Sequence, residues 1–274
     1  MTHPSSPQIT ILTPSYNQAA FIEQTILSVI DQDYPRVQHI VIDGGSTDGT
    51  LEILRKYSHL TWISEKDRGQ ADALRKGLEL STGDIVGWLN SDDFYEPKIF
   101  ERVVVRFQNP STSWVIGNLT YLYGETGTTV LNKSPHVTHE ALLHNPDIVR
   151  QQPTFFRRAF LEQAGGWNPE YFMAMDFDLW VRLAKLVPPL MVDEGWAYFR
   201  HHAAQKTSLT NTRRQSNEIR SILKREGASP VVLAKFYLHR RWLLTKGHLK
   251  NWLIAQGVIP ARYRNRPIRL AVKA

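Results

Sequence analysis

Cysteine is missing from this chain of 274 residues, and its absence removes two kinds of structure. Without thiols there are no disulfides and no thiolate metal sites, which fits a reducing compartment. No run of about 18 apolar residues occurs, so no membrane-spanning helix is expected. The first segment, Met1 to Gln8, is polar and lacks the apolar core of a signal peptide. The sequence therefore predicts a cytoplasmic protein whose contact with a membrane, if it has one, is peripheral and on the inner face.

Several sequence motifs are missing as well. The chain has neither a G-x-S-x-G nucleophile motif nor a P-loop, and no His/Asp/Glu spacing that is typical of zinc. It has no internal repeat, and no recognition motif accompanies its basic residues, so no nucleic-acid partner is expected. The remaining composition is globular, with 42% hydrophobic and 22% charged residues. The length allows one large α/β domain, or one domain with a helical appendage.

Charge is distributed unevenly along the chain. The net charge is +7, but residues 213–274 alone contain 15 Lys/Arg against two acidic residues, a net charge of +13. The rest of the chain therefore carries a net charge of −6. We expect these two parts to meet different partners.

Strand-like and helix-like patterns alternate through the first 90 residues. Short apolar runs indicate strands, and apolar residues at helical spacing indicate helices between them. This alternation predicts an α/β fold with a mainly parallel sheet and crossover helices. The predicted strands are 9–12, 37–42, 60–64 and 85–89, and the predicted helices are 20–30, 51–57 and 70–80.

The second half is less regular. Short strands are expected at 114–117, 119–123 and 153–157. A helix is expected within 171–187, where two prolines end it.

Polar segments follow the four predicted strands of the first half. They are Thr13 to Asn17, Asp43 to Asp48, Glu65 to Arg68 and Asn90 to Asp93. Ligands of open α/β sheets bind outside the carboxyl ends of the strands. We therefore expect these segments, three of which carry carboxylates, to converge on one crevice.

Asp92 and Asp93 form an adjacent acidic pair directly after the predicted strand 85–89. Mg²⁺ and Mn²⁺ prefer oxygen ligands and usually take one or two carboxylates together with phosphate oxygens. The pair therefore suits a divalent ion that grips a diphosphate. Taken alone, the pair suits a solvated turn at least as well, because Asn, Ser and Asp are turn formers. Its place beside other polar loops favours the ligand role.

The turn from Asp43 to Gly49 is rich in glycine. Glycines allow a ligand to approach the backbone closely, and Thr47 or Asp48 can cap the next helix, whose N-terminus favours an anion. A plain strand-to-helix turn explains the segment equally well.

Two further clusters follow in the second half. Asp176 and Asp178 lie two residues apart at a helix start, so one can point into the crevice while the other caps or pairs with Arg182. A carboxylate near an acceptor hydroxyl is a suitable general base. His201 and His202 can complete a metal site or touch a phosphate, although a histidine pair is more often structural.

Five stretches, in order, resemble family 2 glycosyltransferases with the GT-A fold. Together they span roughly residues 8 to 210, and their order makes the resemblance specific although each is weak alone. They are ITILTPSYNQAAFIEQTILSVIDQDYP, HIVIDGGSTDGTLEIL, DRGQADALRKGLELSTGDIVGWLNSDD, FMAMDFDLWVRLA and YFRHHAAQKTS.

The resemblance implies an inverting transfer of a sugar from a nucleotide-sugar to a hydroxyl, in cell-surface polysaccharide or glycolipid synthesis. It implies that Asp93 and His202 bind Mn²⁺ or Mg²⁺ and that Asp176 is the general base. A glycan or a lipid-linked molecule would be the acceptor. The side chains implied to surround the nucleotide-sugar are Thr13, Ser15, Tyr16, Asp43, Gln70, Arg75 and Asp92.

Four positions depart from the family's usual pattern. Gly44 stands where a second Asp is common and often reads uracil, so UDP, dTDP and GDP remain open as the nucleotide. Asn90 replaces the common first Asp of the acidic motif. Leu74 and Arg75 stand where Arg-Asn is frequent, so Arg75 would approach the diphosphate from a shifted position. Met175 replaces a frequent Glu, which leaves Asp176 as the base.

The resemblance divides the chain into a GT-A catalytic domain, 1–212, and a basic helical C-terminal extension, 213–274. The nucleotide-binding half of the catalytic domain covers about 8–95, and the acceptor half about 96–212.

Two rival functions are less well supported. A sugar-nucleotide nucleotidyltransferase normally has a glycine-rich loop with a basic residue after its first strand, whereas this chain has Thr13 to Asn17 there. A non-catalytic sugar-nucleotide-binding scaffold does not explain why both Asp93 and Asp176 are kept.

The extension contains a predicted helix that starts at Ser229-Pro230, with Pro at its first position. Over 230–254 it interleaves aromatic and aliphatic residues with Lys and Arg. A basic amphipathic helix with tryptophan suits an anionic membrane surface, where lipid-linked acceptors are reached. Packing of its apolar face on the catalytic domain or on a second subunit, as in a homodimer, explains the same pattern.

Overall fold

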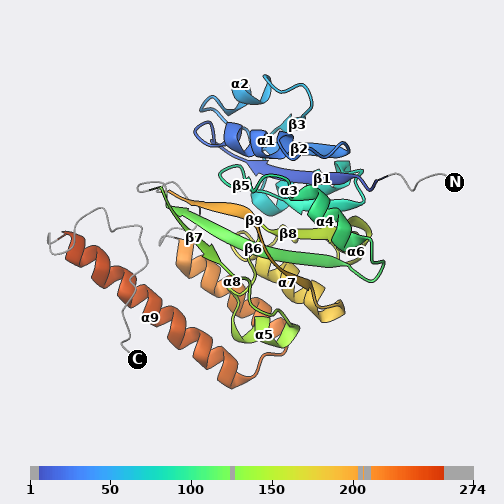
Figure 1. Ribbon diagram of the computed structural model, residues 1–274. Helices are drawn as coiled ribbons and strands as arrows, with labels where there is room; N and C mark the ends of the chain where they lie inside the picture. The colour runs from blue at the N-terminus through green and yellow to red at the C-terminus, as the bar shows by residue number, and fades with distance from the viewer. Residues whose placement is uncertain (1–5, 124–126, 203–205, 207–210, 256–274) are drawn as a thin grey trace.

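Figure 1 shows the computed structural model, which describes residues 6–123, 127–202, 206 and 211–255. A mixed sheet runs through the molecule, and helices cover both of its faces (Figure 1). The strands are β1 (Ile9–Ser15), β2 (Val37–Asp43), β3 (Thr61–Ser64), β4 (Ile85–Trp88), β5 (Phe94–Tyr95), β6 (Trp114–Tyr123), β7 (Thr128–Asn132), β8 (Thr154–Arg157) and β9 (Leu190–His201). The helices are α1 (Ile22–Ile30), α2 (Thr50–Leu54), α3 (Gln70–Leu80), α4 (Phe100–Phe107), α5 (His139–His144), α6 (Arg158–Gln163), α7 (Met175–Leu186), α8 (Thr212–Arg225) and α9 (Pro230–Ala255).

The sheet has the strand order β3-β2-β1-β4-β8-β6-β9-β5, and β7 pairs with β6. The first four strands in this order are parallel to one another, as the alternating patterns predicted. β8 then runs antiparallel to both β4 and β6, so it joins the two halves of the sheet. The prediction of an α/β, Rossmann-like mixed sheet flanked by helices is confirmed.

Aromatic side chains fill the core on one face of the sheet. Trp114 of β6, Phe156 of β8 and Trp180 of α7 stack with ring centroids 5.8 to 6.4 Å apart and are fully buried. Large aromatic side chains bury much apolar area and prefer offset stacking, so this stack fixes α7 against the sheet. The position of α7 matters because Asp176 lies in its first turn.

The sequence predicted the first half more closely than the second. The predicted helix 70–80 coincides with α3, whereas the two strands expected at 114–117 and 119–123 are one strand, β6, with an irregular register near Gly117. A side chain at Gly117 would overlap the indole of Trp196, so glycine is required there and the strand continues past it. The strand β9 was not predicted, because its exposed start carries charges that hide the alternation.

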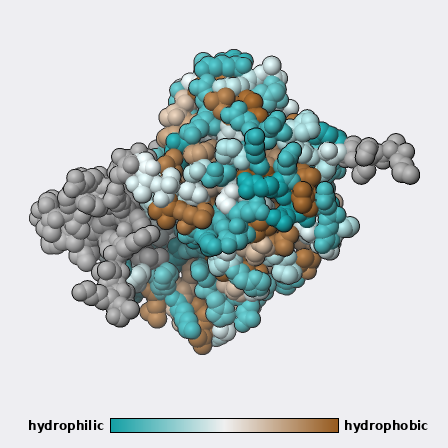
Figure 2. All heavy atoms as spheres, viewed as in Figure 1, coloured by the Kyte–Doolittle hydropathy of each residue, from teal (hydrophilic) through white to brown (hydrophobic). Residues whose placement is uncertain are grey.

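Helix α8 shares the core of the preceding domain. Its residues Ile219, Ile222 and Leu223 are buried in the same cluster as α3 and α7. The predicted boundary at residue 212 stays a prediction, but α8 is packed as an integral part of the fold. Figure 2 shows a mainly hydrophilic face on which apolar residues form small separate patches. Among the described residues, no helix has the length and apolar character that a membrane crossing requires.

Candidate active site

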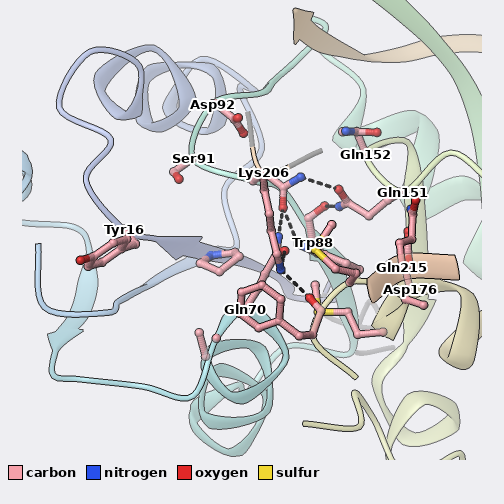
Figure 3. Close-up of a pocket in the computed structure, with 18 of the residues that line it drawn as sticks. Tyr16, Gln70, Trp88, Ser91, Asp92, Gln151, Gln152, Asp176, Lys206 and Gln215 are labelled. Atoms are coloured by element: carbon pink, nitrogen blue, oxygen red, sulfur yellow. Dashed lines mark hydrogen bonds between the residues drawn. The ribbon is translucent and has the colours of Figure 1, made fainter. Parts of the chain in front are cut away.

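A cavity of about 1030 Å³ opens at the carboxyl ends of β1, β2, β3 and β4. All four polar segments expected at this edge contribute residues to the cavity lining. Most residues of the segments 13–17, 65–68 and 90–93 line it, whereas the segment 43–48 contributes only Gly44 and Gly45. The opposite wall comes from the second half, through residues 146–152, 172–177 and α8. Figure 3 shows side chains from both halves pointing into one space. The volume is at the upper end of the range for ligand pockets and suits two substrates.

Ser15 and Tyr16 lie where the first strand ends, and both line the cavity. The hydroxyl of Ser15 is buried and has no hydrogen-bond partner among the described residues. Tyr16 is 62% exposed, which is unusual for a ring and leaves its face open to a ligand. A buried hydroxyl without a protein partner beside an exposed ring is an arrangement typical of a ligand pocket.

Thr13 and Asp43, which the resemblance also implied, do not line the cavity. The Thr13 hydroxyl lies 2.9 Å from Nε2 of His39, inside the sheet. The carboxylate of Asp43 accepts hydrogen bonds from the backbone of Gly45 and Ser46 and from the hydroxyls of Ser46 and Ser64. In this structure Thr13 joins β1 to β2 and Asp43 holds the turn that follows β2, and their nucleotide contacts remain a prediction.

Asn90 is the centre of a hydrogen-bond network that lines the cavity (Figure 3). Its Oδ1 accepts from Nε2 of Gln70 at 2.6 Å and from Nε1 of Trp88 at 2.8 Å. Its Nδ2 donates to Gln151 at 2.9 Å and to Asp93 at 3.2 Å. The amide that replaces a common acid in the family pattern is therefore fully used within the protein.

Arg75 lies outside this cavity. It extends along α3, where it pairs with Glu79 at 2.9 Å and with Asp72 at 3.5 Å. Its predicted contact with a diphosphate stays a prediction.

Asp93 and its neighbour Asp92 have different surroundings. Asp93 is buried, and its carboxylate accepts hydrogen bonds from Gln152 at 2.7 Å, from Asn90 and from the backbone of Arg200 at 3.1 Å. Burial, followed by the charge of Asp92, raises the pKa of Asp93 well above its ordinary value. Its oxygens therefore serve the protein's own network.

Asp92 lines the cavity, and its Oδ2 lies 3.0 Å from Nε2 of His202. The His202 ring is held against Phe21, with centroids 4.3 Å apart, and its Nδ1 has no partner in the described part of the chain. The Asp92 carboxylate is a ligand type that suits Mn²⁺ or Mg²⁺, whereas Nε2 of His202 is engaged with that carboxylate. Within the described residues no group of three or more potential ligands is arranged for a metal. A cation held at Asp92 would therefore need further oxygens, such as those of a diphosphate.

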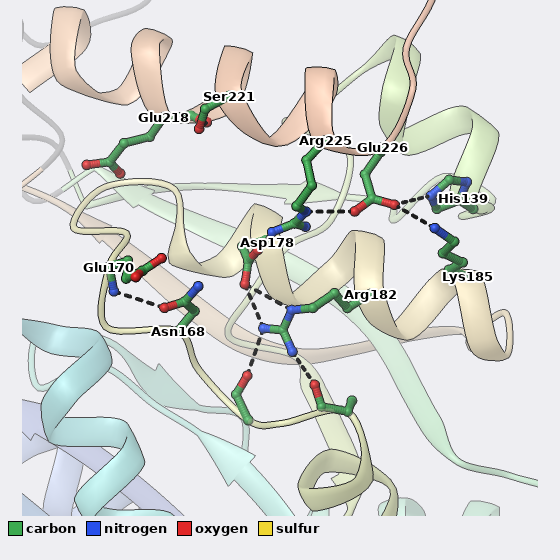
Figure 4. A network of polar contacts seen from close by, with 12 residues as sticks. His139, Asn168, Glu170, Asp178, Arg182, Lys185, Glu218, Ser221, Arg225 and Glu226 are labelled. Atoms are coloured by element: carbon green, nitrogen blue, oxygen red, sulfur yellow. Dashed lines mark hydrogen bonds and ion pairs between the residues drawn. The ribbon is translucent and has the colours of Figure 1, made fainter.

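Asp176 faces the cavity from the first turn of α7 (Figure 3). Burial raises the pKa of its carboxyl from 3.8 to about 6, although the hydrogen bond from the backbone N–H of Phe177 lowers it. Asp178 points away from the cavity into a buried ion-pair cluster with Arg182 and Arg225 (Figure 4). The structure thus separates the two carboxylates as their spacing suggested: Asp176 is available for chemistry and Asp178 is structural.

Gln151 and Gln152 line the cavity, and the sequence did not predict them. Because β8 runs antiparallel to β4, the residues before β8 lie at the edge where β4 ends. Knowledge of the antiparallel pairing of β8 with β4 would have predicted that Gln151 and Gln152 lie at the cavity. Lys206 was also missed, although it lies within the stretch YFRHHAAQKTS that carries the resemblance.

Lys206 lies between the two sides of the cavity. Its Nζ donates to Gln70 at 3.2 Å and to the carbonyl of Phe172 at 2.6 Å, and it lies 4.2 Å from the Phe172 ring centroid. Burial lowers the pKa of Lys206 to about 8, although Asp176 and Glu218 raise it. A partly desolvated cation at this place favours an anionic ligand.

The fold and the site define a class of protein. A parallel α/β half that ends in a polar nucleotide-sized crevice, with a histidine and carboxylates around it, is the arrangement of GT-A glycosyltransferases. The chain belongs to glycosyl transferase family 2, whose sequence model matches residues 10–176.

The comparisons with individual proteins agree with this family. TuaG of Bacillus subtilis, a glycosyltransferase assigned to teichuronic acid biosynthesis, is 38% identical over 102 residues, which are 35% of this chain and 40% of TuaG. The chain thus spans less than half of the length of that relative. Staphylococcus aureus TarS in complex with UDP-GlcNAc has a TM-score of 0.65 at 18% identity, covering 86% of this chain and 72% of that one. The mannosyltransferase PcManGT from Pyrobaculum calidifontis, with GDP-Man and Mn²⁺, has a TM-score of 0.62 at 20% identity, covering 92% and 76%. At these identities the two structures establish the fold.

Proposed function

We propose that this chain is an inverting glycosyltransferase that moves a sugar from a UDP-, dTDP- or GDP-sugar to a hydroxyl of a glycan or lipid-linked acceptor. The product would belong to a cell-surface polysaccharide or glycolipid. The observation that carries the proposal is the pairing of Asp92 with His202 on one side of a cavity that Asp176 faces from the other side. The nucleotide-sugars bound by TarS and PcManGT support it.

The donor would bind along the ends of the first strands. The nucleoside would lie against Ser15, Tyr16 and the open backbone at Gly44, and the diphosphate would reach Asp92 and Lys206. We assign the metal to Asp92 and His202 in place of Asp93, because the Asp93 carboxylate is enclosed by protein donors. A divalent ion bound there would neutralise the departing diphosphate.

Asp176 would act as the general base. It accepts the proton of the acceptor hydroxyl while that oxygen attacks the anomeric carbon, the bond to the diphosphate breaks, and the configuration inverts. A pKa of about 6 suits this task, because the carboxyl is mostly ionised at neutral pH and is still a stronger base than an exposed aspartate.

An aromatic face supports a saccharide acceptor. Tyr121 of β6 and Phe199 of β9 line the cavity with ring centroids 5.7 Å apart. Tyr123 and His201 extend the row along the same sheet face and stack at 4.7 Å. The electron-rich faces of such rings attract the C–H groups of a sugar ring. We therefore place the acceptor sugar on Tyr121 and Phe199, beside Asp176.

A panel of UDP-, dTDP- and GDP-sugars, read by thermal shift with and without Mn²⁺, tests the donor proposal. A ligand at 100 times its Kd stabilises the folded state by about 2.7 kcal/mol, a shift of several degrees. We expect one nucleotide class to give this shift and Mn²⁺ to increase it. The absence of any shift across the panel would remove the proposed function. An equal thermal shift with and without Mn²⁺ would contradict only the proposed metal dependence and would leave the donor proposal in place.

Helix α9 as a whole is not the amphipathic helix that the sequence predicted, because its apolar residues are distributed almost evenly around it, but one exposed apolar stripe suits an anionic membrane surface. Val231, Leu238 and Trp242 lie on one stripe of the helix, are at least half exposed, and face away from the packed side formed by Val232 and Phe236. Basic residues flank the stripe, and the whole segment 213–274 has the charge complementary to acidic lipids. Three further apolar residues of the predicted helix 230–254, Leu243, Leu249 and Trp252, lie outside the described side chains.

Vesicle sedimentation tests this placement. With equal parts phosphatidylglycerol and phosphatidylcholine, replacement of Val231, Leu238 and Trp242 by serine should abolish pelleting. The matched control is Val105→Ser, which changes an exposed apolar residue on α4. Equal pelleting of the triple serine variant and the Val105→Ser control would show that the stripe does not bind the membrane. Loss of a dimer in the triple variant, with no change in pelleting, would show that the stripe binds a second copy of the chain.

A further inference from the structure

Glu218 of α8 lies against the segment that leads into α7. Its Oε2 accepts the backbone N–H of Met173 at 2.7 Å and of Ala174 at 2.9 Å, and its Oε1 accepts the N–H of Phe172 at 3.3 Å. Arg214 of the same helix donates to Oε1 at 2.9 Å. The Glu218 side chain is 13% exposed, so one partly buried carboxylate gathers four donors.

This contact anchors the backbone that leads into α7. The N–H groups that Glu218 accepts belong to the N-cap residue Ala174 and to the two residues before it, so they precede the helix. Within the first turn, the Asp176 carboxyl accepts the N–H of Phe177. A negative charge near a helix N-terminus is favourable, and Glu218, 44 residues further along the chain from Ala174, supplies one. The first turn that follows the anchored residues carries Asp176.

Phe172 connects residues 172–174 to the side of the cavity where the donor is proposed to bind. Its ring lies between Lys206 and Arg214, each 4.2 Å from the ring centroid. A Cβ atom at Gly69 would lie 2.9 Å from this ring, so the ring rests on the backbone just before α3. Phe172, Met173 and Ala174 themselves line the cavity. Residues 172–174 therefore form part of the wall of the cavity in which the donor and the acceptor are proposed to bind.

We propose that Glu218 is a positioning residue for Asp176, and that α8 thereby completes the active site. The carboxylate holds residues 172–174 so that the first turn of α7 presents Asp176 to the cavity. This inference rests on the proposed function, which makes Asp176 the base. It gives α8 a catalytic contribution that its basic composition did not indicate.

The chain offers a matched control in Glu226, at the other end of α8 (Figure 4). Its side chain is only 6% exposed and contacts Arg225, Lys185 and His139, so it too is a partly buried carboxylate that ties α8 to the domain. Among the described residues its ion pairs are with those three side chains and not with residues 172–174, and Lys185 lies in the last turn of α7, remote from Asp176. Glu218→Gln and Glu226→Gln therefore remove similar charges from the same helix.

Two readouts on the full chain test the role of Glu218. The first is amide hydrogen exchange of the peptide containing 172–176, which needs no substrate. The second is release of nucleoside diphosphate from the donor that gives the largest thermal shift. In Glu218→Gln the new amide can accept through one atom only, so at least one buried N–H loses its partner. We expect faster exchange, about tenfold lower kcat with donor KM within twofold, and a displaced pH profile of kcat.

The controls separate the possible results. Glu226→Gln should match the parent chain in exchange of 172–176, in kcat and in pH profile, whatever it does to Tm. Parent-like exchange and kcat in Glu218→Gln would overturn the proposal, and so would equal effects of the two variants. If the parent releases no nucleoside diphosphate from any donor, the proposed function fails. The exchange comparison then decides alone, and equal exchange in the parent and Glu218→Gln overturns the positioning role.

Discussion

The two halves of the sheet contribute to the site in different ways. In the first half each strand passes directly into a loop that lines the cavity, so neighbours in space are close to a strand end in sequence. In the second half the cavity wall is assembled from Gln151, Asp176, Lys206 and Gln215, which come from four separate segments. Under the proposed function, the first half would hold most of the nucleotide-sugar, and the second half would supply the residues that choose the acceptor and perform the transfer.

The largest expected effect comes from the second half. Asp176→Asn should lower the rate of sugar transfer by about 10²- to 10⁴-fold, the usual contribution of a general base. Steady-state release of nucleoside diphosphate in the presence of acceptor measures it. Asp178→Asn is not a suitable control because it breaks a buried ion-pair cluster, so Glu226→Gln serves instead. Turnover equal to that of the parent would remove Asp176 as the base.

The next effect belongs to the proposed metal site, where Asp92 of the first half meets His202 of the second half. Asp92→Asn and His202→Ala should each weaken Mn²⁺-dependent donor binding by about tenfold or more, a loss of at least about 1.4 kcal/mol. Calorimetric titration with and without Mn²⁺ measures the difference. Asp93→Asn should act mainly on folding, since its carboxylate accepts from Gln152 and the Arg200 backbone. Loss of metal dependence in Asp93→Asn with a normal Tm would return the metal to Asp93.

A pH profile gives a smaller, graded effect. Because the folded-state pKa of Asp176 is about 6, kcat should fall about tenfold per pH unit below that value and be level above it. Rates from pH 5 to 8 with a saturating donor test this. A level profile down to pH 5 would contradict the raised pKa.

The same pKa predicts a stability change with the opposite sign to the activity change. The folded protein binds the Asp176 proton more tightly than the unfolded chain, whose aspartates have a pKa near 3.8. Stability should therefore fall as the pH rises from about 4 to about 6, and Asp176→Asn should raise Tm at pH 7.5 but not at pH 4. Thermal melts at the two pH values measure it. An unchanged Tm of Asp176→Asn at pH 7.5 would show that the buried, ionised carboxylate of Asp176 does not destabilise the folded protein.

The smallest effect is expected from α9. Arg240 pairs with Asp147 at 3.3 Å, but Asp147 is half exposed, so Arg240→Met should cost at most about 1 kcal/mol. Tm should drop by only about 2–4 °C and turnover should stay within twofold. A strong loss of turnover would instead give α9 a part in the site, since Asp147 lines the cavity.

The sequence predicted the frame of the first half because its periodicity is local. Helix α3 coincides with its predicted range, and the polar strand ends meet as parallel topology requires. The second half depends on pairings that no local pattern contains. Gln152 reaches Asp93 only because β8 pairs antiparallel with β4, and Glu218 reaches Ala174 only because α8 packs beside α7.

The acidic pair Asp92-Asp93 shows the same limit within two residues. Residue type and position after the strand identified both carboxylates as candidate ligands. Which of them remains available to a ligand depends on donors distant in sequence, the Gln152 amide and the Arg200 backbone, which bond to Asp93. Asp92 remains beside His202, at the cavity.

The central claim is that Asp92 belongs to the donor site, which is formed mainly by the first half, and that Asp176 of the second half is the base. Donor affinity of Asp176→Asn and Asp92→Asn, titrated side by side with Mn²⁺, tests it most directly. We predict that Asp176→Asn binds the donor within twofold of the parent, whereas Asp92→Asn binds it about tenfold or more weakly. Weak binding by Asp176→Asn together with parent-like binding by Asp92→Asn would contradict this division.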